Sequence, residues 1–134
     1  YGVIPALSPI APYRLDFLMK LKVAGKTLKS HWKVVYDKAV KQEEVIFSLL
    51  SSEFETVFSK EIREKMVTFK FMEDRGGQLK IHSTISKKAR SAFLTALIEN
   101  QVQTVEEARR LSFAGFAYRE DLSQPQELVF VKEV

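Results

Sequence analysis

Three cationic side chains crowd one short stretch of this chain, in the order Ser86-Lys87-Lys88-Ala89-Arg90. Apolar residues recur at helical spacing beyond it, which predicts a helix from about residue 87 to about residue 100. Cations in the first turn of a helix oppose its dipole at a cost of about 0.3–1 kcal/mol each, whereas the free N–H groups there attract anions. We therefore expect an anion, such as a phosphate, sulfate or carboxylate, to contact Lys87 or Arg90.

The helical phase of this stretch leaves two interpretations open. At about 100° per residue, the apolar residues place Arg90 on the apolar side, Lys87 at its edge and Lys88 outward. A buried arginine is rarely left unpaired, so Arg90 could form an ion pair with a carboxylate such as Asp16 or Glu53. Alternatively, Arg90 and Lys87 could hold the phosphate of a ligand together with backbone N–H groups.

Two carboxylates are candidates for acid–base chemistry. Asp16 and Glu53 each follow an apolar or extended segment, where the end of a strand could carry them into a cleft. Glu53 is equally explained as an acid that stabilises the start of a helix. The two histidines, His31 and His82, lack the spacing of metal ligands, and no phosphate-binding glycine loop or serine-hydrolase motif is present. We expect no metal site and no cofactor.

Composition restricts the class of protein. The chain has 134 residues, of which 46% are hydrophobic, enough for one domain. It has no cysteine, which excludes disulfides and thiolate chemistry, and no apolar run of the roughly 20 residues that a membrane helix needs. We expect a soluble, cytoplasmic protein. The net charge of +4 favours polyanions only mildly, and the lysine-rich stretch from residue 20 to residue 41 fits either a solvated helix face or a track for nucleic acid.

The pattern of residues predicts an α+β fold, in which a mixed or antiparallel sheet packs with several helices. A segment at 13–22 reads as extended. The other expected elements, in chain order, are a helix at 27–41, a strand at 44–50, a short helix opened by a capping box of Ser52 and Glu55, a β-hairpin of 66–72 and 79–83, the helix at 87–100, a short helix capped by Thr104 and Glu107, and strands at 113–118 and 127–131.

The chain also resembles a known family. Several segments match in order across all 134 residues, and Pro12-Tyr13-Arg14-Leu15 together with Lys87-Lys88-Ala89-Arg90 are the most specific of them. The others are Tyr1-Gly2-Val3, Asp16, Trp32, Ser51-Ser52-Glu53-Phe54, Ile98-Glu99-Asn100, Gly115-Phe116 and Glu127-Leu128-Val129-Phe130. On these residues the sequence is similar to the YaaA peroxide-stress family. The N-terminal half of that family, with its Pro-Ala-Lys-Thr motif, is absent, so we expect residues 1–134 to be the C-terminal part of a YaaA-like protein.

The resemblance implies a cytosolic bacterial protein that limits oxidative damage under hydrogen peroxide, with lowered free iron and DNA binding both proposed for the family. It also implies a shared cleft lined by Arg14, Asp16, Ser51, Glu53, Lys87, Lys88 and Arg90. Three positions depart from the family pattern. Phe17-Leu18 stands where Met-Gly is usual, Ser91 replaces a glycine, and Ser48 stands where an asparagine is common. The loss of that glycine could block a close approach of ligand to backbone.

Our leading hypothesis is a stress-response protein that binds DNA without sequence preference, through phosphates held by Arg14, Ser51, Lys87, Lys88 and Arg90. One alternative is an enzyme that acts on a nucleotide or base with Asp16 and Glu53 as its acid–base pair. Another is direct sequestration of iron. We expect no membrane partner, and we expect residues 1–134 alone to self-associate as a two-fold dimer, because the absent half should cover apolar surface.

Overall fold

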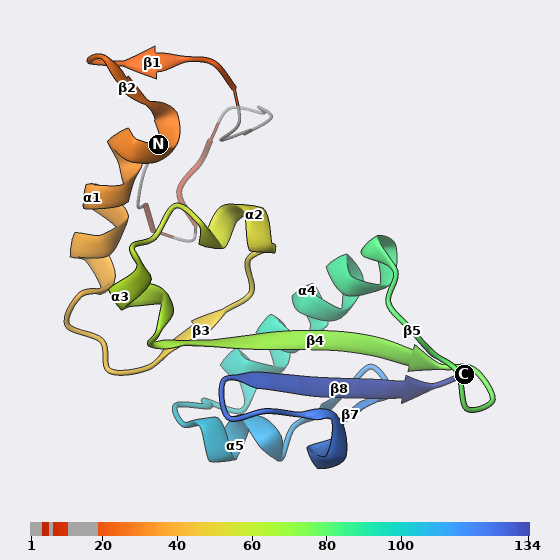
Figure 1. The fold of residues 1–134 in the computed structure, drawn as a ribbon. Coiled ribbons are helices and arrows are strands. Elements are labelled where there is room, and N and C mark those ends of the chain that lie inside the picture. The colour runs from red at the N-terminus through yellow and green to blue at the C-terminus, as the bar shows by residue number, and fades with distance from the viewer. Residues whose placement is uncertain (1–3, 6, 11–18) are drawn as a thin grey trace. The chain divides into compact units, whose positions relative to one another are not determined.

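A computed structural model describes residues 4–5, 7–10 and 19–134 of the chain (Figure 1). The predicted site residues Arg14 and Asp16, and most of the segment expected to be extended at 13–22, lie outside these described residues. The expected α+β class is confirmed, with helices and a mixed sheet. The contacts within the chain divide it into two compact units, Tyr1–Met66 and Val67–Val134.

In the first unit, a small hairpin leads directly into a long helix. Strands β1 (Lys22–Val23) and β2 (Lys26–Thr27) pair antiparallel across a turn at Ala24 and Gly25, both of which have positive φ. Helix α1 (Leu28–Val40) follows, and the hydroxyl of Thr27 caps it by accepting a hydrogen bond from the N–H of Ser30. The predicted helix at 27–41 is therefore confirmed.

The remainder of the first unit contains strand β3 (Ile46–Ser48) and two one-turn helices, α2 (Ser52–Glu55) and α3 (Lys60–Arg63). The predicted strand at 44–50 is present but shorter. The predicted capping box was wrong, because Ser51 rather than Ser52 is the N-cap and its side chain makes no capping bond. The Glu55 carboxylate instead accepts a 2.7 Å hydrogen bond from the hydroxyl of Ser48. Ser48 is buried, and a buried hydroxyl requires a partner.

The second unit is built on a mixed sheet. Strand β8 (Glu127–Glu133) runs parallel to β4 (Met66–Asp74) and antiparallel to β7 (Phe116–Tyr118). Strand β6 (Ser112–Phe113) pairs with β7, and β5 (Leu79–Lys80) pairs with the end of β4. The long helix α4 (Ser83–Glu99), the short helix α5 (Val105–Arg109) and the 3-10 turn η1 (Glu120–Leu122) complete the unit (Figure 1).

Aromatic packing joins α4 to one face of this sheet. The ring of Phe93 on α4 is fully buried, and its centroid lies 4.6 Å from that of Phe69 and 5.2 Å from that of Phe130. Phe71 and Phe113 extend the same cluster. Edge-to-face and tilted ring pairs of this kind add to the stability that area burial alone provides. The cluster fixes the middle of α4 on the face formed by β4 and β8.

The predicted start of α4 was wrong by about one turn. The helix begins at Ser83 with His82 as N-cap, so Lys87 lies in its second turn and not its first. The alternation of Leu79, Ile81 and Ser83 suggested a longer strand, but β5 ends at Lys80 and Ile81 is exposed. With no buried face to hold the strand, the segment turns into the helix earlier. The three cations therefore do not lie in the first turn, where they were expected to oppose the helix dipole.

The segment predicted as one strand at 113–118 is a tight hairpin. Ala114 and Gly115 both have positive φ, at 47° and 84°, as a two-residue turn between antiparallel strands requires. The chain consequently reverses between β6 and β7. The strand predicted at 127–131 is confirmed as β8, with two further residues.

The predicted capping box at the start of α5 is confirmed. The hydroxyl of Thr104 accepts from the N–H of Glu107, and the Glu107 carboxylate accepts from the N–H groups of Gln103 and Thr104. These backbone hydrogen bonds favour the charged carboxylate and lower the pKa of Glu107. In the same way, two hydrogen bonds from Arg119 lower the pKa of Asp121 in η1.

Candidate anion-binding pocket

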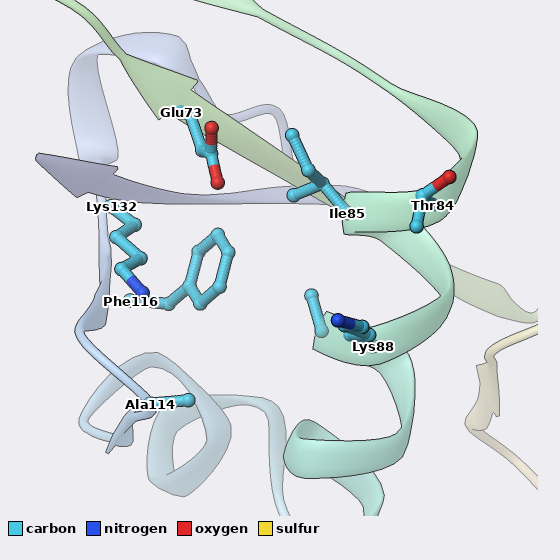
Figure 2. A pocket seen from close by; sticks show the side chains of 8 residues that line it. Glu73, Thr84, Ile85, Lys88, Ala114, Phe116 and Lys132 are labelled. Carbon is cyan, nitrogen blue, oxygen red and sulfur yellow. The ribbon is translucent and has the colours of Figure 1, made fainter. Parts of the chain in front are cut away.

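A pocket of about 380 Å³ lies within the second unit, where the carboxyl ends of β4 and β8 meet the first turns of α4 (Figure 2). Two lysines and one glutamate supply its charged groups, and small or apolar side chains supply the rest. Its lining residues are Glu73, Thr84, Ile85, Lys88, Ala89, Ala114, Phe116 and Lys132. The carboxyl ends of parallel strands are a common location for ligand sites in sheets with helical crossovers.

The pairing of β4 with β8 places two oppositely charged residues beside each other at the pocket. Side chains alternate along a strand, so Glu73 shares a face with Phe71, and Lys132 shares a face with Phe130. Glu73 and Lys132 are direct partners in the parallel pairing of β4 with β8. Each buried aromatic row therefore ends in a charged residue that lines the pocket, and Figure 2 shows Glu73 and Lys132 there.

The charges of the pocket are unevenly compensated. Glu73 already accepts a 2.9 Å hydrogen bond from the guanidinium of Arg75, and its side chain is only 14% exposed. Lys88 and Lys132, by contrast, make no hydrogen bond or ion pair with any residue of the second unit, all of which the structure describes. The arrangement leaves two ammonium groups beside a carboxylate that is already neutralised.

The floor of the pocket is apolar and firmly held. Phe116 is 5% exposed and stacks on Phe113 at 5.5 Å, while Phe71 approaches it edge-on at 6.0 Å. Ala89, a residue of α4, is also buried. Because these side chains belong to the core, the floor has little freedom to rearrange.

Gly115 gives Lys132 the space to lie along the turn between β6 and β7. A Cβ at Gly115 would be 3.2 Å from Cε of Lys132 and 3.4 Å from its Cδ. Lys132 is also the register partner of Phe116. The turn and the strand pairing therefore position this ammonium group together.

Among the cations predicted on α4, the structure distributes the three side chains differently from the prediction. Lys88, expected to point outward, is exposed and also lines the pocket. Lys87, expected at the edge of the apolar side, is exposed; it lies opposite the buried residues Ala89 and Phe93 at helical spacing. Arg90 is half-buried, in line with its expected inward direction, and makes no ion pair within the second unit. A pair between Arg90 and Asp16 or Glu53 stays a prediction.

The other predicted site residues lie in the first unit. Ser51 is the half-buried N-cap of α2, and its carbonyl oxygen accepts from the N–H groups of Phe54 and Glu55. Glu53 is exposed in the first turn of α2, where an acid stabilises the helix dipole. Among the residues that the structure describes, no group of three or more histidine, aspartate or glutamate side chains is arranged to hold a metal ion.

Sequence reasoning missed Glu73, Phe116 and Lys132. A signal for two of them was present, since the alternating apolar rows of β4 and β8 each continue into a charge at the next position on the same face. What the sequence could not indicate is that these two strands are neighbours and run parallel, which depends on the crossover through α4 and α5.

Two segments that carry the family resemblance, Lys87–Arg90 and Gly115-Phe116, come together at this pocket. The family model described as peroxide stress protein YaaA matches residues 1–122. The chain belongs to this family, as the sequence resemblance predicted. No helix in the described part of the chain is both long and apolar enough to span a membrane.

Similar proteins come from Streptococcus pneumoniae. A UPF0246 protein of strain JJA is 91% identical to this chain, and one of strain D39 / NCTC 7466 is 90% identical, in each case over all 134 residues. The chain spans about half, 55%, of the length of these relatives.

Proposed function

We propose that this protein acts in the response to peroxide stress by binding DNA through its phosphate backbone, with the N-terminal half of α4 as the contact surface. The family description supports the peroxide-stress role. The contact surface consists of Lys87, Lys88 and Arg90, with Arg14 and Ser51 as further contacts expected from the sequence. Bound protein would limit iron-dependent damage by covering the sugar–phosphate chain.

The charge distribution along α4 is the observation that carries the proposal. Its only acidic residue, Glu99, is its last residue, whereas Lys87, Lys88 and Arg90 lie within about one turn nearer its start. The positive end of the helix dipole lies on the same side as these cations. The N-terminal half is therefore strongly positive, and none of the three cations is paired within its own unit.

Binding of this kind should be independent of DNA sequence. Lysine supplies a point charge for phosphate without the bidentate contacts that distinguish bases. The affinity would come mainly from counterion release and fall steeply with salt.

The test is a titration of a fluorescent duplex with the protein at several salt concentrations. Each phosphate contact contributes a slope of about −0.9 in log affinity against log salt, so Lys87→Ala should reduce the slope by up to about one unit. Lys70→Ala is the matched control, because this lysine is already paired with Glu127 at 2.7 Å. Equal slopes for the wild type and Lys87→Ala would remove α4 from the interface.

A second measurement addresses protection. Supercoiled plasmid exposed to ferrous iron and hydrogen peroxide should be nicked more slowly in the presence of the wild-type protein than with Lys87→Ala. If both variants protect equally although Lys87→Ala binds DNA more weakly, protection arises from removal of iron or peroxide rather than from coverage of DNA.

A further inference from the structure

We infer that the pocket between β4, β8 and α4 binds a small organic phosphate, with the phosphate on Lys88 and Lys132 and the organic part on Phe116. This site shares Lys88 with the proposed DNA contact but differs from it in depending on Lys132 and not on Lys87. Lys88 lies where the two surfaces adjoin.

Charge complementarity points to a phosphate monoester. Lys88 and Lys132 bring two positive charges that no group of the second unit neutralises, while Arg75 compensates Glu73. A phosphate monoester carries about −1.5 to −2 charges at pH 7, so one such group matches both lysines. A carboxylate would match only one. The first turn of α4, which supplies Thr84 and Ile85, adds the positive end of a helix dipole to the same pocket.

The apolar floor calls for an organic part in addition to the phosphate. Phe116 and Ala89 are held by the core, and Ile85 and Ala114 border them. The accessible apolar surface comes mainly from Ile85 and Ala114, since Phe116 and Ala89 are only 5% and 2% exposed, and inorganic phosphate would leave it uncovered. A planar or apolar group resting on Phe116 would bury it, and a pocket of about 380 Å³ has room for a ligand of mononucleotide size.

Figure 2 shows how the charges surround this floor. Lys132 enters from the end of β8, Lys88 from α4, and Glu73 from the end of β4, with the ring of Phe116 between the strands and the helix.

The test is calorimetric titration of the 134-residue chain with adenosine monophosphate, adenosine and inorganic phosphate. Adenosine monophosphate should bind at least about tenfold more tightly than either of the others, because only it engages both the lysines and the floor. Lys132→Gln should weaken its binding by about tenfold. Lys70→Gln is the matched control, because Lys70 lies on the opposite face of β4 and pairs with Glu127.

Each outcome supports or overturns the inference. Equal affinities for adenosine and adenosine monophosphate, or equal losses in Lys132→Gln and Lys70→Gln, would overturn it. Thermal melting of each variant verifies folding, and Lys88→Gln provides a second test if Lys132→Gln does not fold. Lys87→Ala should leave adenosine monophosphate binding unchanged, and Lys132→Gln should leave the salt slope of DNA binding unchanged, so either proposal can fail without the other.

Discussion

Glu73 and Lys132 lie opposite each other at the ends of two parallel strands, yet they do not form an ion pair. The carboxylate of Glu73 is held by Arg75, two residues further along the chain, and Lys132 extends instead beside Gly115 and Phe116. Because Glu73 and Lys132 do not pair with each other, the ammonium group of Lys132 is available to a ligand. We regard this as the central feature of the pocket.

Removal of the Glu73 charge should strengthen the binding of an organic phosphate. Glu73→Gln frees Arg75 and removes a negative charge near the ligand, so affinity for adenosine monophosphate should rise about two- to fivefold, equivalent to about 0.5–1 kcal/mol. Calorimetric titration measures the change, and Glu99→Gln at the far end of α4 is the charge-matched control. Weaker binding in Glu73→Gln would mean that the carboxylate itself contacts the ligand.

Gly115→Ala should disturb both stability and the pocket. Alanine at a positive φ costs about 1 kcal/mol, and the new Cβ would also crowd Lys132. Gly77→Ala is the matched control, because Gly77 has a similar φ of 87° and nothing within 4 Å of the added carbon. Urea denaturation should show that both variants lose a similar amount of unfolding free energy through the backbone. Gly115→Ala should lose more, because its Cβ also crowds Lys132. Only Gly115→Ala should weaken ligand binding, and the lack of such a difference would show that Lys132 needs no space there.

The capping box of α5 makes stability depend on pH. The pKa of Glu107 is lowered in the folded protein, so its contribution is present above the ordinary glutamate pKa of about 4.3 and is lost as the pH falls through the lowered value. Glu107→Gln should therefore lower the urea midpoint at pH 7 and reduce the loss of stability between about pH 5 and pH 3. A parallel profile for Glu107→Gln and the wild type would contradict this assignment.

Thr104→Ala tests the same cap from its other side. Loss of the hydroxyl that accepts from Glu107 should cost about 1 kcal/mol in the free energy of unfolding. The Glu107 carboxylate keeps its bonds to the N–H groups of Gln103 and Thr104 in this variant, so most of the pH dependence should remain. Urea denaturation at pH 7 and at pH 4 separates the two effects.

We propose that residues 1–134 associate with a second copy when studied alone. Helix α1 has no buried residue, and Val34 and Val35 on it are 68% and 41% exposed. Exposed apolar surface of this kind favours contact, and a two-fold dimer would need to bury more than about 1,000 Å². Light scattering at micromolar concentration should give the mass of a dimer, and Val34→Glu should shift it toward a monomer. A monomeric wild type would contradict the proposal.

Local patterns in the sequence were sufficient wherever the interaction is local. The Thr104 and Glu107 box needs only a spacing of three residues, and it formed as predicted. The same spacing at Ser52 and Glu55 failed because a buried hydroxyl, Ser48, competes for the carboxylate. The competitor lies outside the motif, so spacing alone could not reveal it.

The pocket itself could be predicted only in part. Lys88 was among the expected anion-binding residues, because the cluster of cations is visible in the sequence. Glu73 and Lys132 were not, because their proximity results from parallel pairing between strands separated by most of the second unit. Leu94 and Ile98, counted with the apolar side of the helix, are exposed, so the predicted helical phase placed Lys87 too far inward.

The parallel pairing of β4 with β8 also determines when the pocket can exist during folding. Strands β4 and β8 are the first and last strands of the second unit, and α4, α5, β6 and β7 lie between them in the chain. Contacts between such distant segments form late because loop closure must precede them. A ligand that needs Lys132 can therefore recognise only the finished unit. Its binding would report complete folding and would protect the finished unit from reopening, without guiding the earlier steps.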